Sequence, residues 1–386
     1  MKLRWPSTIW LVLYVTSLTA ALTTVAGSPE WNLDGVFYSA LTMPCSSFAD
    51  VHDKVYAAVE RDVPSPSVEA LTGGSAYRTT IRTSAKAFAL QLPFYTSKPL
   101  YVWLGQCVTA LGGSSVRAPY LVSAISFALI GLVLPLLCVA AGAARTDALI
   151  ASALAVWLPS LRELGALASP DALATALTMC AAVVSLSHPR LTFLPLTGAV
   201  LARPDAVILA GGLLAALWTR QQTRLPTREI VFASVLVVVV AFLVPRLSAS
   251  YGWQTVMRHT FLERVLDDAT ATRGLRPKDY LTSLVRGLRG EMTNHAAGFI
   301  PYLVVALLSG GLYVKNGCIK SQRPAAMLLA GIWCATLIRF LFMPILADRF
   351  FAPAYMCTIA MGCALIASRE PGLIEDSPTF RASRSA

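Results

Sequence analysis

Apolar runs recur along the whole chain of 386 residues, and they limit its possible folds more than any other feature. The runs cover residues 9–26, 119–143, 148–161, 172–187, 191–202, 206–218, 230–245, 297–314, 325–338 and 350–367. The chain is 55% hydrophobic and 14% charged, which excludes an ordinary soluble domain. Backbone groups find no water in a bilayer core, so spanning segments of this kind must be helical. The pattern predicts an all-α, polytopic membrane protein with about ten hydrophobic segments, several of them short for a span.

Two long polar stretches interrupt the apolar runs, and they divide the chain into predicted regions. The regions are a first transmembrane segment (1–27), an extracytoplasmic loop with interfacial helices (28–117), a transmembrane bundle (118–245), a second extracytoplasmic loop (246–296), C-terminal transmembrane segments (297–368) and a disordered cytoplasmic tail (369–386). Within the loops, Pro99 to Leu111 is too short to span and is expected at the interface. Lys278 to Arg289 has amphipathic spacing and predicts a surface helix.

Basic residues predict the orientation, because Lys and Arg gather in cytoplasmic loops. They stand at Arg145, at Arg190, in the trio Arg220, Arg224 and Arg228, and in the group Lys315, Lys320 and Arg323. All of these basic residues face the cytoplasm if both chain termini are cytoplasmic and if segments 191–202 and 206–218 form a hairpin. A single kinked helix there would turn the later clusters outward. The net charge of +11 therefore indicates inner loops and anionic lipid rather than nucleic acid.

The N-terminus and the cysteines leave alternatives open. Residues 9–26 also fit a signal peptide, with Val25-Ala26-Gly27 as a cleavage site, but cleavage would leave Asp34 on a loose new terminus. We therefore expect an uncleaved first span. The eight cysteines contain no CxxC pair, and Cys45 and Cys107, both on the predicted outer side, are candidates for a disulfide. No metal-ligand spacing is present, so neither an essential metal nor a cofactor is predicted.

An acidic residue stands among aromatic residues at the outer end of the first apolar run. The phrase is Glu30-Trp31-Asn32-Leu33-Asp34-Gly35-Val36-Phe37-Tyr38. Asp34 has two interpretations: the cap of a short loop helix, or a general base that takes a proton from an acceptor hydroxyl. In the same loop, Lys98 is either a phosphate ligand or a snorkelling anchor. A carboxylate and a lysine at one membrane face suit chemistry on a lipid-linked phosphate.

Further charged candidates lie at the outer ends of later apolar runs. Asp171 is expected either as the second residue of a helix that is capped by Ser169 and has Pro170 in its first turn, or near the donor. Arg203 lies between two apolar segments, where a guanidinium is paired or functional, and Asp205 is the nearest partner. Arg349 is a third basic candidate; its alternative is an interfacial pair with its neighbour Asp348.

Two tyrosines complete the set of candidates. Tyr38 follows Asp34 by four residues, and Tyr101 follows Lys98 by three. Either ring can stack on a sugar, and either can belong to the aromatic belt at the membrane interface.

These phrases, in this order, resemble the GT-C superfamily of membrane glycosyltransferases, which use polyprenyl-phosphate sugars. The likeness is greatest to the protein mannosyltransferase and aminoarabinose transferase branch, glycosyltransferase family 39. The matching phrases are Asp34 with Tyr38, Lys98-Pro99-Leu100-Tyr101, Ser169-Pro170-Asp171-Ala172-Leu173 and Arg203-Pro204-Asp205. They fall within residues 1–220. The chain departs from the family at Gly35, where a second acid is usual, and at Leu100, where a second Pro is usual.

The resemblance implies transfer of a sugar from a polyprenyl-phosphate donor to an extracytoplasmic glycan, lipid or protein. Asp34 would be the catalytic base of an inverting reaction, and Lys98 would stabilise charge on the departing phosphate. Arg203, Arg349, Tyr38, Tyr101 and Asp171 would bind the substrates. The expected location is a bacterial inner membrane, with the active site facing outward.

Two other functions remain open. A polytopic transporter or flippase of lipid-linked saccharides fits the apolar runs, although transporters rarely need two long outer loops. A non-catalytic relative that binds polyprenyl-linked glycans fits the loss of the second acid at Gly35.

Overall fold

The computed structural model describes residues 7–44, 48–219, 227–294, 296–315, 323–345 and 347–367. These residues form helices and no β-strand; one isolated β-bridge joins Glu30 and Leu167. The predicted all-α class is therefore confirmed. The tail 369–386 and Cys45 lie outside the described residues, so the pairing of Cys45 with Cys107 stays a prediction.

The apolar runs all become helical. The helices are α1 (Ser7–Gly27), α8 (Ala118–Ala140), α9 (Arg145–Ala155), α10 (Pro159–Ala166), α11 (Asp171–Ser187), α12 (Phe193–Ala202), α13 (Ala206–Thr219), α14 (Thr227–Leu247), α18 (Ala296–Lys315), α19 (Arg323–Phe342) and α20 (Asp348–Ala367). In the described chain, five of them (α1, α8, α14, α19 and α20) are long and apolar enough to cross a membrane, and the bent pair α9–α10 makes a sixth possible. This supports a multi-pass membrane protein, with fewer helices of full spanning length than the ten predicted segments.

The run 148–161 was predicted as one segment, and the structure divides it. Helix α9 ends at Ala155, α10 begins at Pro159, and their axes differ by 64°. Proline has no N–H to donate and its ring disfavours the helical conformation of the preceding residue. Leu158 accordingly has φ −61° and ψ 132°, which is not helical. Hydropathy continues through this break and did not reveal it, and the bent pair α9–α10 still fits a single broken span.

Helices α12 and α13 form the predicted hairpin around Arg203-Pro204-Asp205. Helix α12 ends at Ala202 and α13 begins at Ala206. Phe193 at the start of α12 and Leu217 near the end of α13 line the same small cavity, so the two helices are antiparallel.

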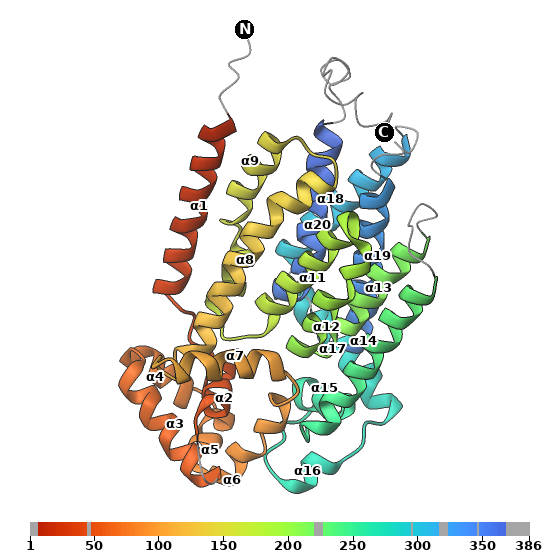
Figure 1. The fold of residues 1–386 in the computed structure, drawn as a ribbon. Helices are drawn as coiled ribbons and strands as arrows, with labels where there is room; N and C mark the ends of the chain where they lie inside the picture. Colours follow the sequence, from red (N-terminus) through yellow and green to blue (C-terminus); the bar gives the residue numbers. More distant parts are fainter. Residues whose placement is uncertain are drawn as a thin grey trace, which may run out of the picture.

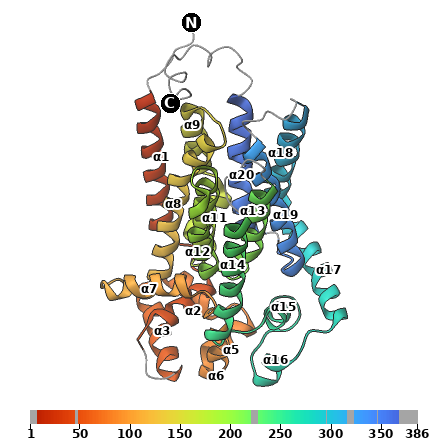
Figure 2. The same ribbon diagram turned by 45° about the vertical axis from the view of Figure 1, so that its right-hand side comes forward.

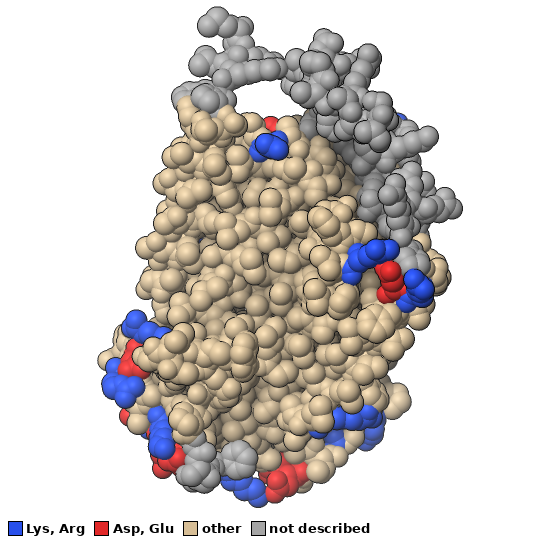
Figure 3. All heavy atoms as spheres, in the orientation of Figure 1, with Lys and Arg blue, Asp and Glu red and all other residues tan. Residues whose placement is uncertain are grey.

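The long helices form a bundle with two different ends (Figure 1). The first described turn of α1 and the last of α20 lie at one end, called here the termini end. Helices α2 to α7 and α15 to α16 lie at the other, the loop end, and Figure 2 shows the same division. The visible flank of the bundle has few charged side chains, whereas charges gather at the loop end (Figure 3). A flank of this kind suits contact with hydrocarbon.

The predicted first loop folds into a lobe with its own core, called here the first lobe. Its helices are α2 (Leu33–Thr42), α3 (Phe48–Asp62), α4 (Ser65–Thr72), α5 (Ala76–Thr83), α6 (Ala85–Ala89), the 3-10 helix η1 (Leu92–Phe94) and α7 (Pro99–Ala110). Phe37, Tyr56 and Phe88 are buried in this core. Helix α7 lies across the loop end of the bundle in both views (Figures 1 and 2).

The second loop contributes α15 (Trp253–Phe261), α16 (Asp268–Thr272) and α17 (Pro277–Asn294). Helix α17 contains the predicted surface helix and exposes an apolar stripe at helical spacing. The stripe consists of Leu281, Val285, Leu288 and Met292. The first lobe and the second loop meet through Lys86, whose ammonium lies 2.7 Å from the Asp268 carboxylate.

Candidate functional site

A cavity of about 740 Å³ lies at the loop end, where three parts of the fold meet. Its walls come from the first lobe, from the starts of α11, α13 and α20 with the residues before them, and from α15 of the second loop. Of the seven residues predicted from the sequence, six line it. They are Asp34, Tyr38, Lys98, Asp171, Arg203 and Arg349.

Asp34 lies in the first turn of α2, where a negative charge interacts well with the helix dipole. Its carboxylate does not cap the helix. The Tyr95 hydroxyl donates to Asp34 Oδ1 at 2.8 Å, and within the described chain this is the only hydrogen bond to Asp34. Oδ2 is thus left without a hydrogen-bond donor from these residues. The geometry fits a proton acceptor better than a helix cap.

Tyr95 stays protonated, because burial and the neighbouring Asp34 raise the pKa of its phenol well above the usual range. It is therefore a fixed hydrogen-bond donor to Asp34. Tyr38 packs edge-on against Tyr95, with ring centroids 5.0 Å apart, and against Tyr101 on its other side at 4.8 Å.

Tyr101 does not line the cavity. Its hydroxyl donates to the Pro119 carbonyl at 2.7 Å and shares a hydrogen bond with Ser123, which ties α7 to α8. The ring is 1% exposed and lies behind Tyr38. Its position is that of a packing residue, and neither the predicted sugar contact nor the alternative of an interfacial belt describes it.

Lys98 precedes α7 and extends into the cavity wall. Its ammonium donates to the Phe94 carbonyl and lies 5.6 Å from the centre of the Tyr95 ring. Burial and the nearby Arg203 lower the pKa of Lys98 to about 8, from a usual value of 10.5. A snorkelling lysine would keep its charge in bulk water and an ordinary pKa. The position of Lys98 instead suits a partly desolvated anion.

The bundle side of the cavity is a network of ion pairs. Arg203 contacts Asp171, and its Nε lies 2.7 Å from Asp205 Oδ1. The other Asp205 oxygen lies 2.6 Å from Arg339 Nε, on α19. The predicted Arg203–Asp205 pair is thus present, within a larger network. In this network the carboxylates of Asp171 and Asp205 neutralise the guanidinium groups of Arg203 and Arg339.

Phe350 organises the arginines of this network. The guanidinium carbons of Arg203, Arg339 and Arg349 lie 4.5, 4.6 and 5.1 Å from the centre of its ring. Arg349 is held least, because its nearest carboxylate oxygen in the described chain, on Asp171, is 3.7 Å from Nε. Its Nε has no hydrogen-bond acceptor among these residues. Arg349 is therefore the arginine of this wall with the most capacity for a ligand.

Asp171 is buried, at 5% exposure, and begins α11. The Ser169 hydroxyl accepts a hydrogen bond from the Asp171 backbone N–H and donates to Asp171 Oδ2 at 2.5 Å. The predicted cap is wrong by one residue, because α11 begins at Asp171 and its N-cap residue is Pro170; Ser169 nevertheless accepts from the first N–H of the helix. The second interpretation, a position near a ligand, also fits, because Asp171 lines the cavity.

Sequence reasoning missed the part of the cavity made by the second loop and α5. His259 accepts a hydrogen bond from the Val265 N–H at 3.0 Å, and its ring lies 4.4 Å from that of Phe94. Burial lowers the pKa of His259 to about 4, so it is neutral near pH 7. Arg78 and Arg264 also line the cavity. Arg78 belongs to the first loop and His259 and Arg264 to the second, so no local sequence pattern identifies these contacts.

The lining carries an excess of positive charge. Five cations (Arg78, Lys98, Arg203, Arg264 and Arg349) face two carboxylates (Asp34 and Asp171), a difference of three charges. A cavity with this balance attracts an anionic ligand. In the described residues, no group of three or more His, Cys, Asp or Glu side chains could hold a metal ion. Comparisons with protein families, with curated proteins and with solved structures find no match to this chain.

Proposed function

We propose that the protein is a membrane glycosyltransferase that moves a sugar from a polyprenyl phosphate to an acceptor hydroxyl. One observation carries the proposal: a carboxylate with an oxygen left open, on Asp34, shares a cavity with Lys98 and Arg349. These residues come from three separate stretches of the chain. A general base and phosphate ligands in one cavity are what such a transfer requires.

In the proposed reaction, Asp34 Oδ2 takes the proton of the acceptor hydroxyl while that oxygen attacks the anomeric carbon of the sugar. The bond from the anomeric carbon to the phosphate oxygen breaks, and the electron pair leaves with the polyprenyl phosphate. Lys98 and Arg349 stabilise the charge that grows on the phosphate. Attack opposite to the leaving group inverts the anomeric centre.

The proposed placement rests on the basic residues, which gather in cytoplasmic loops. The loop end with its cavity faces outward, the termini end faces the cytoplasm, and the shorter apolar helices join the full-length spans to give about ten membrane segments. A bacterial inner membrane is the proposed location, with an envelope glycan, lipid or protein as acceptor.

The direct test supplies the purified protein in lipid nanodiscs with a panel of radiolabelled polyprenyl-phosphate sugars and envelope extracts. We expect label in an acceptor with the wild-type protein and background label with Asp34→Asn. Lack of transfer across the panel, with binding of the donors retained, would favour the non-catalytic relative. Movement of a fluorescent lipid-linked saccharide across vesicles, equal in wild type and Asp34→Asn, would favour the flippase.

A further inference from the structure

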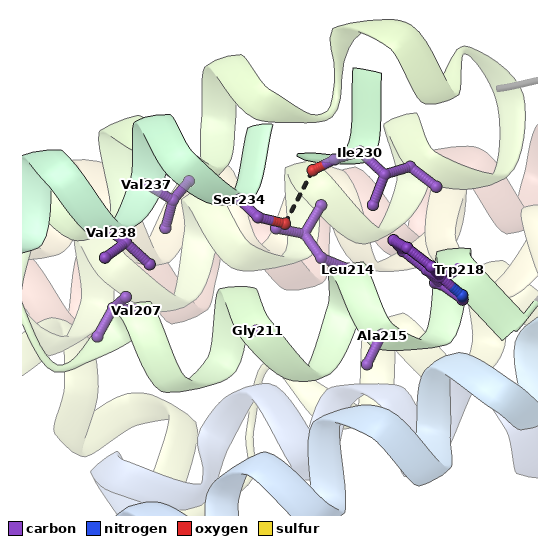
Figure 4. A pocket seen from close by; sticks show the side chains of 9 residues that line it. All are labelled: Val207, Gly211, Leu214, Ala215, Trp218, Ile230, Ser234, Val237 and Val238. Carbon is purple, nitrogen blue, oxygen red and sulfur yellow. Dashed lines mark hydrogen bonds between the residues drawn. The ribbon is translucent and has the colours of Figure 1, made fainter. Parts of the chain in front are cut away.

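A groove lies between α13 and α14 on the bundle (Figure 4). Two adjoining cavities of about 360 and 180 Å³ form it, and they share Leu214 and Ile230. The larger is lined by apolar side chains and by Ser234. The Ser234 hydroxyl is satisfied by the Ile230 carbonyl at 2.8 Å, the dashed line in Figure 4. The lining of this larger cavity contains no buried, unmet polar side chain, which favours a hydrocarbon occupant there.

The groove opens toward the surroundings of the bundle. Trp218, Phe232 and Val238, which line it, are 58%, 61% and 57% exposed. The 18-residue apolar window of α14 is only 17% buried within the protein. Since α14 is long and apolar enough to cross a bilayer, this open side faces lipid.

The length of the groove matches one leaflet. The residues of α14 that line it run from Glu229 to Val238. Nine steps of helix correspond to roughly 14 Å, which is about half of a hydrocarbon core of ~30 Å. Glu229 lies in the first turn of α14, which is the end of that helix farther from the loop end (Figure 1). The groove therefore covers the half of the span that belongs to the leaflet on the termini side.

Charge marks the same end. Arg190 and Glu229 line the smaller cavity, with Arg190 Nε 3.4 Å from the carboxylate. The Arg190 side chain is 73% exposed, and the adjacent Arg228 is exposed as well. Arg228 does not line the cavity, but it directly precedes Glu229, so two arginines stand near one carboxylate at this end. At the other end, Val207 and Val238 line the groove without a charged neighbour in the lining.

We propose that this groove binds an anionic phospholipid of the leaflet at the termini end. One acyl chain lies between α13 and α14, and the phosphate lies near Arg190 and Arg228. Arginines near the membrane surface attract anionic headgroups. The apolar groove covers the apolar surface of one acyl chain. The site is separate from the loop-end cavity and does not depend on glycosyl transfer.

Gly211 provides a way to fill the groove without disturbing the helix. A Cβ at Gly211 would meet no atom within 4 Å, whereas one at Gly212 would collide with the Gly331 backbone of α19. Gly211→Trp therefore occupies the space of the acyl chain, and Gly211→Leu is the milder variant. Gly311→Trp on α18 is the matched control, because Gly311 is exposed and equally unobstructed.

The test adds dioleoyl phosphatidylglycerol to delipidated, detergent-purified protein and measures occupancy by native mass spectrometry. Wild type and Gly311→Trp should retain the lipid. Gly211→Trp should bind it about tenfold more weakly, as expected for loss of roughly 60 Å² of apolar contact. The affinity of Gly211→Leu for the lipid should lie between those of wild type and Gly211→Trp. This variant replaces Gly211→Trp in the test if the tryptophan variant does not fold. Equal retention by wild type and both Gly211 variants would overturn the proposal.

A second arm identifies the headgroup. Wild type should prefer phosphatidylglycerol to dioleoyl phosphatidylcholine, and the double variant Arg190→Gln/Arg228→Gln should lose that preference. Absence of any preference in the wild type would reject the anionic headgroup. Displacement of phosphatidylglycerol by decaprenyl phosphate in wild type, but not in Gly211→Trp, would assign the groove to a prenyl chain and reject the phospholipid.

Discussion

The two walls of the loop-end cavity hold their carboxylates in opposite ways. On the first lobe, Asp34 has a single neutral partner, the Tyr95 hydroxyl, in the described chain. On the bundle, Asp205 lies between Arg203 and Arg339, and Asp171 contacts the same Arg203 and also Arg349. A carboxylate bound by permanent cations contributes to structure, because its charge is already compensated. A carboxylate with one neutral donor keeps an oxygen open for a ligand.

The largest expected effect comes from removing the Asp34 carboxylate, on the first-lobe wall of the cavity. Asp34→Asn keeps the size of the side chain and its bond to Tyr95, but it cannot accept a proton. Loss of a positioned general base lowers a rate by about 10²–10⁴-fold. We expect that loss in kcat for sugar transfer, with expression and thermal stability close to wild type.

Asp171→Asn is the informative comparison for this measurement, since it removes a carboxylate of the same cavity that arginines already neutralise. If Asp34→Asn transferred sugar at a near-normal rate while Asp171→Asn did not, the two walls would exchange their proposed roles.

The second-largest effect comes from removing the Asp205 carboxylate, which belongs to the ion-pair network of the bundle wall. Asp205→Asn would leave Arg203 and Arg339 without their shared carboxylate. Removing one partner of a buried ion pair costs about 3–5 kcal/mol, and the partial exposure of Asp205 points to the lower figure, about 3 kcal/mol. We expect a clear drop in the melting temperature of the detergent-purified protein. A melting temperature unchanged by Asp205→Asn would show that this network does not hold the cavity wall.

These two walls also show how much of the fold and of the site can be predicted from the sequence. Hydropathy predicted the helices because each apolar run is longer than a strand needs, and the basic residues predicted the α12–α13 hairpin. The break before Pro159 was missed because both of its sides are apolar. Local phrases identified Asp34, Lys98 and Arg203 as candidates, since charge beside an apolar run is costly.

The partners of these residues could not be predicted in the same way. Tyr95 lies 61 residues from Asp34, and Arg339 lies 134 residues from Asp205. No local pattern specifies such contacts, because they depend on how separate helices pack. Tyr38 and Tyr101 each follow a charged candidate residue by three or four positions, so the sequence does not distinguish them. The packing of the helices places Tyr38 in the cavity lining and Tyr101 against the Tyr38 ring, outside the lining.

A third effect sharpens the comparison through pH. Lys98, with a pKa lowered to about 8, is charged near pH 7 and loses its proton as the pH rises through about 8. Since the neutral amine cannot stabilise phosphate, kcat/KM for the donor should fall above that pH. Lys98→Arg should move the fall to higher pH. Lys98→Ala should remove this limb and lower kcat/KM by about tenfold, as expected for a charged hydrogen bond of ~1.5 kcal/mol. An identical pH profile for the three proteins would exclude Lys98 from the phosphate site.

The smallest expected effect tests whether the single partner of Asp34 positions it. Tyr95→Phe removes the hydroxyl and keeps the ring that packs against Phe37 and Tyr38. A hydrogen bond of this kind contributes about 1 kcal/mol net, so kcat should fall by roughly fivefold while the KM for donor stays constant. The loss should vanish in an Asp34→Asn background, because a phenol that acts only through Asp34 has nothing left to orient. An equal loss in both backgrounds would show that Tyr95 contributes independently of Asp34, and the carboxylate would then lack the fixed position that the comparison of the two walls assigns to it.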